Sequence, residues 1–80
     1  MMKHLTMRIY GRVQGIGFRY DARQKAQELG VTCFARNEPD GSVYIEAEGD
    51  DEKLKKFLKW CGKGPWLAKV ERVESGWSDR

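Results

Sequence analysis

The chain has 80 residues, of which 40% are hydrophobic and 34% charged. This length suits one domain and is too short for two, and the composition is that of an ordinary globular chain, so we expect a single domain over residues 1–80. No run approaches the roughly 20 consecutive apolar residues of a membrane span, and the first residues, MMKHLTMRIYGRV, lack the apolar block of a signal peptide. A net charge of +3 favours anionic partners, either phosphorylated small molecules or nucleic acid.

The first 30 residues predict a strand, a tight loop and a helix. Apolar and polar residues alternate over residues 5–11, the period of a half-buried strand. Three glycines in residues 11–17 exclude a regular element and demand a loop. Apolar residues then recur at helical spacing over residues 20–29, and Gly30 is placed to end this helix in a left-handed conformation.

Two extended runs follow, residues 31–37 and 42–49. They are separated by Glu-Pro-Asp-Gly, whose proline and glycine suit a tight turn, so the two runs predict a hairpin. In the second run, the apolar residues that we expect to face the core are Val43, Ile45 and Ala47.

The last part predicts a second helix and a final strand. Asp50 or Asp51 can cap the helix, and lysines occupy its polar side. Its apolar stripe consists of Leu54, Phe57, Leu58 and Cys61. Residues 69–74 predict a strand, in which Val70 and Val73 stand three apart instead of two, so a bulge or an early end is expected there.

The resulting order is strand, helix, strand, strand, helix, strand. This is the split βαβ arrangement, so we expect an α+β fold of the ferredoxin-like type: an antiparallel βαββαβ sandwich with both helices on one face of the sheet. The same architecture carries enzymes, metal carriers and RNA-binding modules. Function must therefore be inferred from the residues of a site.

The glycine-rich loop and the residues after it have the chemistry of a phosphate site. Gly15 and Gly17 allow successive backbone N–H groups to turn toward an anion, and the helix that follows adds its partial positive charge. Arg19, where loop and helix meet, can hold two phosphoryl oxygens at once with its planar guanidinium. From composition alone, a mere strand-to-helix turn with a solvated Arg19 remains an equal alternative.

Two motifs resolve this choice through resemblance. The run GRVQGIGFRY closely resembles the signature of the acylphosphatase family, with Ile16 as a conservative replacement for valine. Downstream, CFARNEPDGSVYIEAEG resembles the second signature of that family, and similarity extends through the second helix to WLAKVERV. The resemblance covers all but the two ends of the chain.

The resemblance implies an enzyme that hydrolyses the carboxyl-phosphate bond of acyl phosphates, without a metal or cofactor. The lack of an apolar span and of a signal peptide predicts a cytoplasmic location, and we expect a monomer. The resemblance also implies that Asn37 orients the attacking water. Without the resemblance, the favoured interpretation is that Asn37 is a turn residue that opens the hairpin. The residues that it implies for phosphate binding are Val13, Gln14, Gly15, Ile16, Gly17, Phe18 and Arg19.

Several residues receive a structural interpretation. His4 has no partner at ligand spacing and is expected to be solvated, and Phe18 is expected to anchor the loop in the core. Cys33 and Cys61 stand far apart in the sequence and are expected to be reduced thiols; Cys33 replaces a glycine usual in the family. Family members often add a further short strand, whereas this chain stops at GWSDR, so an uncovered sheet edge is expected.

Two other functions remain as alternatives. An RNA-binding module of the same architecture would stack bases on Tyr10, Phe34 and Tyr44 on the open face of the sheet. Against it, the third strand reads GSVYIEAEG, which is acidic and lacks the pattern Lys-Gly-Phe-Gly-Phe-Val. A non-catalytic role is the second alternative, because acylphosphatase-like domains also occur at the start of larger carbamoyl-transfer maturation proteins.

Overall fold

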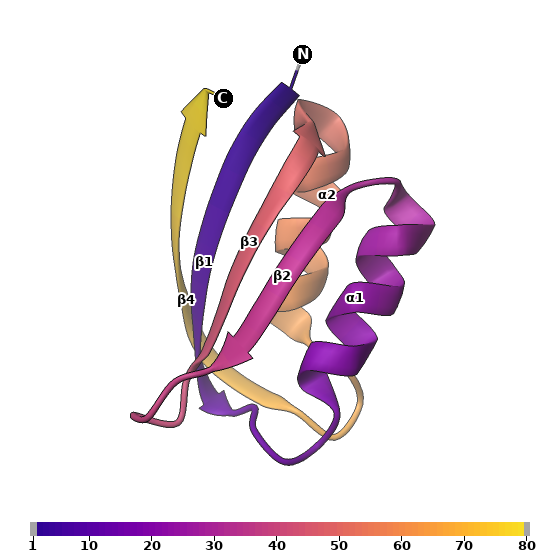
Figure 1. The fold of residues 1–80 in the computed structure, drawn as a ribbon. Coiled ribbons are helices and arrows are strands. Elements are labelled where there is room, and N and C mark those ends of the chain that lie inside the picture. The colour runs from indigo at the N-terminus through magenta and orange to yellow at the C-terminus, as the bar shows by residue number, and fades with distance from the viewer. Residues whose placement is uncertain (1, 80) are drawn as a thin grey trace.

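The computed structural model describes residues 2–79 and confirms the expected order of elements (Figure 1). The elements are β1 (Met2–Arg12), α1 (Phe18–Leu29), β2 (Thr32–Asn37), β3 (Val43–Asp50), α2 (Asp51–Lys63) and β4 (Lys69–Asp79). The expected ferredoxin-like βαββαβ sandwich is therefore present.

The four strands form one antiparallel sheet in the order β2-β3-β1-β4. Both helices lie on the same face of this sheet, with α1 beside β2 and α2 behind the central strands (Figure 1). In the part of the chain that the structure describes, β2 and β4 are the outer strands. The glycine-rich loop, the turn between β2 and β3 and the connection from α2 to β4 gather at the end of the sheet opposite the termini.

The core lies between the sheet and the helices, as the alternation of apolar residues predicts. Leu5, Met7 and Ile9 of β1 and Val43, Ile45 and Ala47 of β3 are all buried. The helices contribute Phe18, Ala22, Ala26, Leu54, Phe57 and Cys61. Trp60 of α2 was not part of the predicted apolar stripe, but it packs between the helices. Its ring centre lies 5.9 Å from that of Phe18 on α1 and 6.5 Å from that of Phe57 on α2.

Helix boundaries follow from the caps. α1 begins at Phe18, two residues before the expected start, because Phe18 lies one turn before Ala22 on the same buried stripe. In α2, Asp50 is the cap: its side chain accepts a hydrogen bond of 3.3 Å from the N–H of Glu52. The exposed side of α2 carries its lysines, as expected.

The strands β1 and β4 are both longer than expected. The prediction that β4 ends at residue 74 is wrong, because it continues to Asp79 and pairs with the first half of β1. The second half of β4 is exposed, and apolar and polar residues do not alternate in it, so no local pattern predicts a strand there. The expected bulge is confirmed: Tyr10 pairs with Arg72 but Gly11 pairs with Val70, which leaves Glu71 as an extra residue.

Gly11 accommodates this bulge. Its φ is 128°, and a Cβ built on it would lie 2.1 Å from the carbonyl oxygen of Lys69 and 2.8 Å from the N of Glu71. We expect Gly11→Ala to lower the free energy of unfolding by about 2–4 kcal/mol, measured by denaturant unfolding, because both the dihedral angle and the contact are unfavourable.

A second glycine provides the control. Gly62 lies inside α2, and a Cβ there meets nothing within 4 Å, so Gly62→Ala is expected to stabilise the protein by about 0.5–1 kcal/mol. If Gly11→Ala unfolds at the same denaturant concentration as the wild type, the close packing at the bulge is refuted.

Both cysteines are free thiols, as expected. Cys61 is buried and Cys33 partly buried, and burial raises the pKa of both; that of Cys33 is raised to about 11.

Within residues 2–79, no group of three or more histidine, cysteine or acidic side chains is placed to hold a metal ion. Neither of the described helices is long and apolar enough to cross a membrane.

Candidate active site

The loop between β1 and α1 has a backbone shaped by its glycines. Gly15 and Gly17 have φ values of 77° and 80°, and a Cβ on either would meet nothing within 4 Å. These glycines are therefore required for their left-handed backbone and not for lack of space. Gly17 is the residue before α1, and no side chain of the described residues caps this helix. Its first N–H groups remain available to a ligand.

A hollow of about 260 Å³ opens beside this loop. It is lined by Val13, Gly15, Gly17, Phe18, Arg19, Tyr20, Arg23 and Asn37. The structure thus brings together Arg19, from the first turn of α1, and Asn37, from the last position of β2. These two residues are 18 positions apart in the sequence and were expected to act on one substrate.

The side chains of Arg19 and Asn37 are exposed and unengaged. Within residues 2–79, neither makes a hydrogen bond or an ion pair through its side chain. Phe18, which also lines the hollow, is buried, which confirms that it anchors the loop in the core. The hollow therefore combines buried apolar lining, Val13 and Phe18, with two polar side chains that are free to bind.

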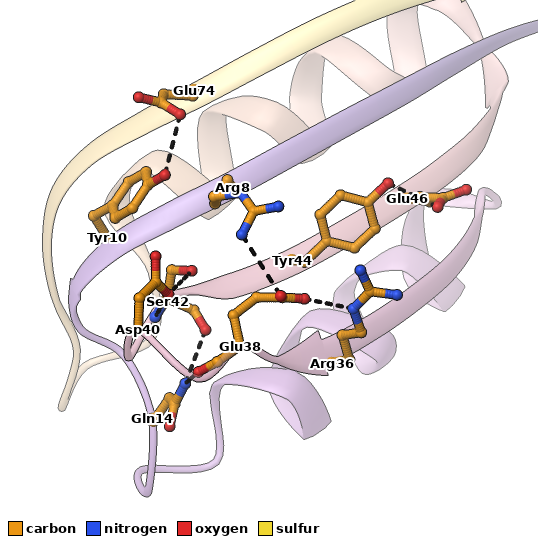
Figure 2. Close-up of polar contacts among 10 residues, drawn as sticks. All are labelled: Arg8, Tyr10, Gln14, Arg36, Glu38, Asp40, Ser42, Tyr44, Glu46 and Glu74. Atoms are coloured by element: carbon orange, nitrogen blue, oxygen red, sulfur yellow. Dashed lines mark hydrogen bonds and ion pairs between the residues drawn. The ribbon is translucent and has the colours of Figure 1, made fainter.

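Gln14 and Ile16 were expected to bind phosphate, but their side chains do not line the hollow. The Gln14 amide donates hydrogen bonds of 2.8 Å to the carbonyl oxygens of Glu38 and Ser42, and so ties the loop to the β2–β3 turn (Figure 2). Ile16 is partly buried against the core. The contribution of their backbone N–H groups stays a prediction.

The turn after Asn37 is held by polar contacts, which Figure 2 shows. The Glu38 carboxylate accepts a hydrogen bond from Arg36 and lies 3.6 Å from the guanidinium of Arg8. Asp40 accepts hydrogen bonds of 2.9 and 2.6 Å from the N–H and hydroxyl of Ser42, and these bonds lower the pKa of the Asp40 carboxyl. Asn37 therefore sits between a strand ladder and a braced turn.

Tyr20 and Arg23 line the hollow but were missed by the sequence analysis. The Tyr20 hydroxyl accepts a hydrogen bond of 2.9 Å from the Gln24 amide. Arg23 donates a long hydrogen bond of 3.4 Å to the carbonyl oxygen of Ala35 on β2. A signal for Arg23 was present, since it lies four residues after Arg19 and shares its helix face.

The geometry agrees with comparisons to known proteins. A sequence model of the family described as Acylphosphatase matches residues 5–80. The chain belongs to the acylphosphatase family. A relative from Thermococcus kodakarensis, named acylphosphatase, is 48% identical over 73 residues, which are 91% of this chain and 80% of the relative. Another, from Thermotoga maritima, is 50% identical over 72 residues, 90% of this chain and 80% of the relative.

A solved structure confirms the fold of this acylphosphatase family member. The crystal structure of acylphosphatase from Bacillus subtilis superposes with a TM-score of 0.88 at 32% identity. The match covers 98% of this chain and 86% of that one.

The prediction that His4 is solvated is wrong. Its ring lies between two carboxylates on the open face of the sheet, with Nδ1 2.9 Å from Glu48 and Nε2 3.2 Å from Glu46. Glu48 is the cross-strand partner of His4, so the contact depends on the β1–β3 register, which the sequence alone does not reveal. His4 is remote in the fold from the residues of the acylphosphatase hollow.

The open face of the sheet does not favour the RNA-binding alternative. Tyr10, Phe34 and Tyr44 carry arginine side chains over their rings: Arg72 lies 3.9 Å from the Tyr10 ring, and Arg36 lies 4.5 Å from the Tyr44 ring and 6.0 Å from the Phe34 ring. The hydroxyls of Tyr10 and Tyr44 bond to Glu74 and Glu46 (Figure 2). The rings of Tyr10 and Tyr44 are thus bordered by carboxylates, which repel a nucleic-acid backbone, while Phe34 stays 52% exposed. The comparisons place the chain among acylphosphatases.

Proposed function

We propose that the chain hydrolyses acyl phosphates to a carboxylate and inorganic phosphate, with the substrate bound in the hollow beside the glycine-rich loop. The observation that carries this proposal is the meeting of Arg19 and Asn37, from two different elements, at one hollow lined by Gly15 and Gly17. Membership in the acylphosphatase family supports the same reaction.

Binding of the phosphoryl group rests on the loop and on Arg19. The backbone N–H groups of residues 13–18 and the N-terminal end of α1 offer donors and partial positive charge to its oxygens. The guanidinium of Arg19 holds two of these oxygens together. Because Arg19 makes no ion pair with the described residues, binding a substrate does not require an internal pair to break.

Hydrolysis then requires a water molecule in line with the bond that breaks. The water oxygen attacks phosphorus, the bond from phosphorus to the carboxyl oxygen breaks, and its electron pair leaves with the carboxylate. A carboxylate is a good leaving group, so a general acid is not needed. The side-chain carbonyl oxygen of Asn37 accepts a hydrogen bond from the water and orients it, and the proton released on attack passes to solvent. Loop donors and Arg19 stabilise the charge that gathers on the equatorial oxygens.

A direct test is the hydrolysis of benzoyl phosphate, followed by absorbance. We expect turnover that is unchanged in excess EDTA, because loop amides and Arg19 supply the charge that a metal ion would bring. Inorganic phosphate is expected to inhibit competitively, since it occupies the same donors. Loss of activity on chelation would contradict the metal-free mechanism. Phosphate binding without turnover would instead favour the non-catalytic role.

The acyl phosphate is proposed to be a small molecule, bound by one copy of the chain in the cytoplasm. The glycine-rich loop, Arg19 and Asn37, on which the proposed mechanism depends, all belong to one chain, so the reaction as proposed calls for no residue from a second copy. Free thiols at Cys33 and Cys61 fit a reducing compartment.

A further inference from the structure

The hollow is lined by a second arginine, Arg23, which the mechanism above does not use. Two arginines and no carboxylate line it, and within residues 2–79 neither arginine forms an ion pair. The phosphoryl group is already served by the loop donors, the end of α1 and Arg19. Positive charge at Arg23 is therefore available for another anion.

We propose that Arg23 binds a second anionic group, a carboxylate or a phosphate, on the acyl part of the substrate. This inference rests on the proposed function and narrows it: the preferred substrates are acyl phosphates that carry an oxyanion at their far end. Tyr20, which is 63% exposed and lines the same hollow, carries an aromatic ring that can offer an apolar surface to the carbon atoms between the two anions.

The position of Arg23 fits this role. Arg19 and Arg23 are one helical turn apart on α1, with Cβ atoms roughly 5–6 Å from each other, a separation that a short carbon chain or one aromatic ring spans. Among residues 2–79, the one hydrogen-bond anchor of the Arg23 side chain is its long bond to Ala35, which is two residues before Asn37 on the outer strand β2. The remaining N–H groups of its guanidinium can donate to a ligand.

The positive charge of Arg23 also has an electrostatic effect on a neighbouring side chain. It acts to lower the pKa of the Cys33 thiol on β2, against the larger effect of burial, which raises it. Within the described residues no carboxylate bonds to Arg23 and competes for this charge. A ligand oxyanion thus meets a guanidinium that is already positioned.

The test compares two non-hydrolysable ligands that differ only in charge, para-carboxybenzylphosphonate and its amide isostere, para-carbamoylbenzylphosphonate. We expect the wild type to bind the carboxylate ligand about five- to tenfold more tightly, measured by titration calorimetry, because a charged hydrogen bond is added. The Arg23→Gln variant is expected to lose this preference, and Arg23→Lys to keep part of it. A third ligand with a para-phosphonomethyl group distinguishes a phosphate from a carboxylate preference.

Lys25→Gln is the matched control. It removes the same charge from the same helix, but Lys25 does not line the hollow and pairs instead with Glu28 at 3.5 Å. This variant is expected to keep the full preference, which separates local binding from the overall charge of the protein.

The outcomes are distinguishable. Equal affinity of the wild type for both benzyl ligands, or equal loss in Arg23→Gln and Lys25→Gln, would overturn the inference. A purely structural Arg23, acting through Ala35, would weaken both ligands alike and leave their ratio unchanged, which also overturns it. Because binding is measured without turnover, failure to hydrolyse benzoyl phosphate would refute the proposed function while leaving this result intact.

Discussion

Replacing Arg19 with alanine is expected to lower the turnover of benzoyl phosphate by on the order of 10³-fold, a loss of about 4 kcal/mol of transition-state stabilisation. The guanidinium holds two phosphoryl oxygens, and the charge on those oxygens grows in the transition state. The inhibition constant for inorganic phosphate should rise as well, since the same clamp binds phosphate in the ground state. Steady-state kinetics with and without phosphate measure both effects.

Arg19→Lys is expected to resemble the alanine variant, because a single ammonium does not reproduce the two-point contact. Arg12→Ala is the control: Arg12 is exposed at the end of β1, near the loop, but does not line the hollow. Its removal should leave both constants near those of the wild type. Turnover of Arg19→Ala within a few-fold of the wild type would rule out the proposed role of Arg19.

Replacing Asn37 with alanine is expected to lower turnover by about 10²- to 10³-fold, while the inhibition constant for phosphate barely changes. The proposed water-orienting amide is removed, but the loop and Arg19 remain. Because the Asn37 side chain makes no hydrogen bond with the described residues, its truncation should also leave the melting temperature unchanged. Kinetics, phosphate inhibition and thermal unfolding are measured on the same preparation.

Asp40→Ala shows what a purely structural defect in this turn would look like. It removes both hydrogen bonds to Ser42, so it should lower the melting temperature and loosen the position of the turn. If Asn37 were only a turn residue, its alanine variant would behave in the same way. An Asn37→Ala protein that melts normally, binds phosphate normally and still turns over near the wild-type rate would exclude water positioning.

Local sequence patterns predicted the type and order of the elements well. Alternation in β1 and β3 and the apolar stripe of α2 are properties of neighbouring residues, so they can be seen without a structure. The second half of β4 and the partners of His4 depend on which strands pair and in what register, and no local pattern encodes this. The bulge is an intermediate case, since the spacing of Val70 and Val73 already suggested it.

The residues of the candidate site also fall into those that the sequence could predict and those that only the fold reveals. Arg19 and Asn37 were found through motifs that resemble the family signatures, and the fold brings them to one hollow. Arg23 shares a helix face with Arg19, but only the structure shows that this face borders the hollow. Gln14 was expected to bind phosphate as part of the loop, and the role of its backbone N–H stays a prediction. Its side chain bonds to the carbonyl oxygen of Glu38, 24 residues later in the sequence, and no local pattern predicted this contact.

The pairing of Lys3 with Asp79 has a practical consequence. These residues face each other across β1 and β4, with an ion pair of 2.7 Å, so both ends of the described chain leave the molecule side by side (Figure 1). The glycine-rich loop begins at the other end of β1, roughly 33 Å away for 11 strand residues. The protein can therefore be attached to a surface by either terminus with the hollow directed toward the solution, and a fluorescent label at either end stays clear of the substrate.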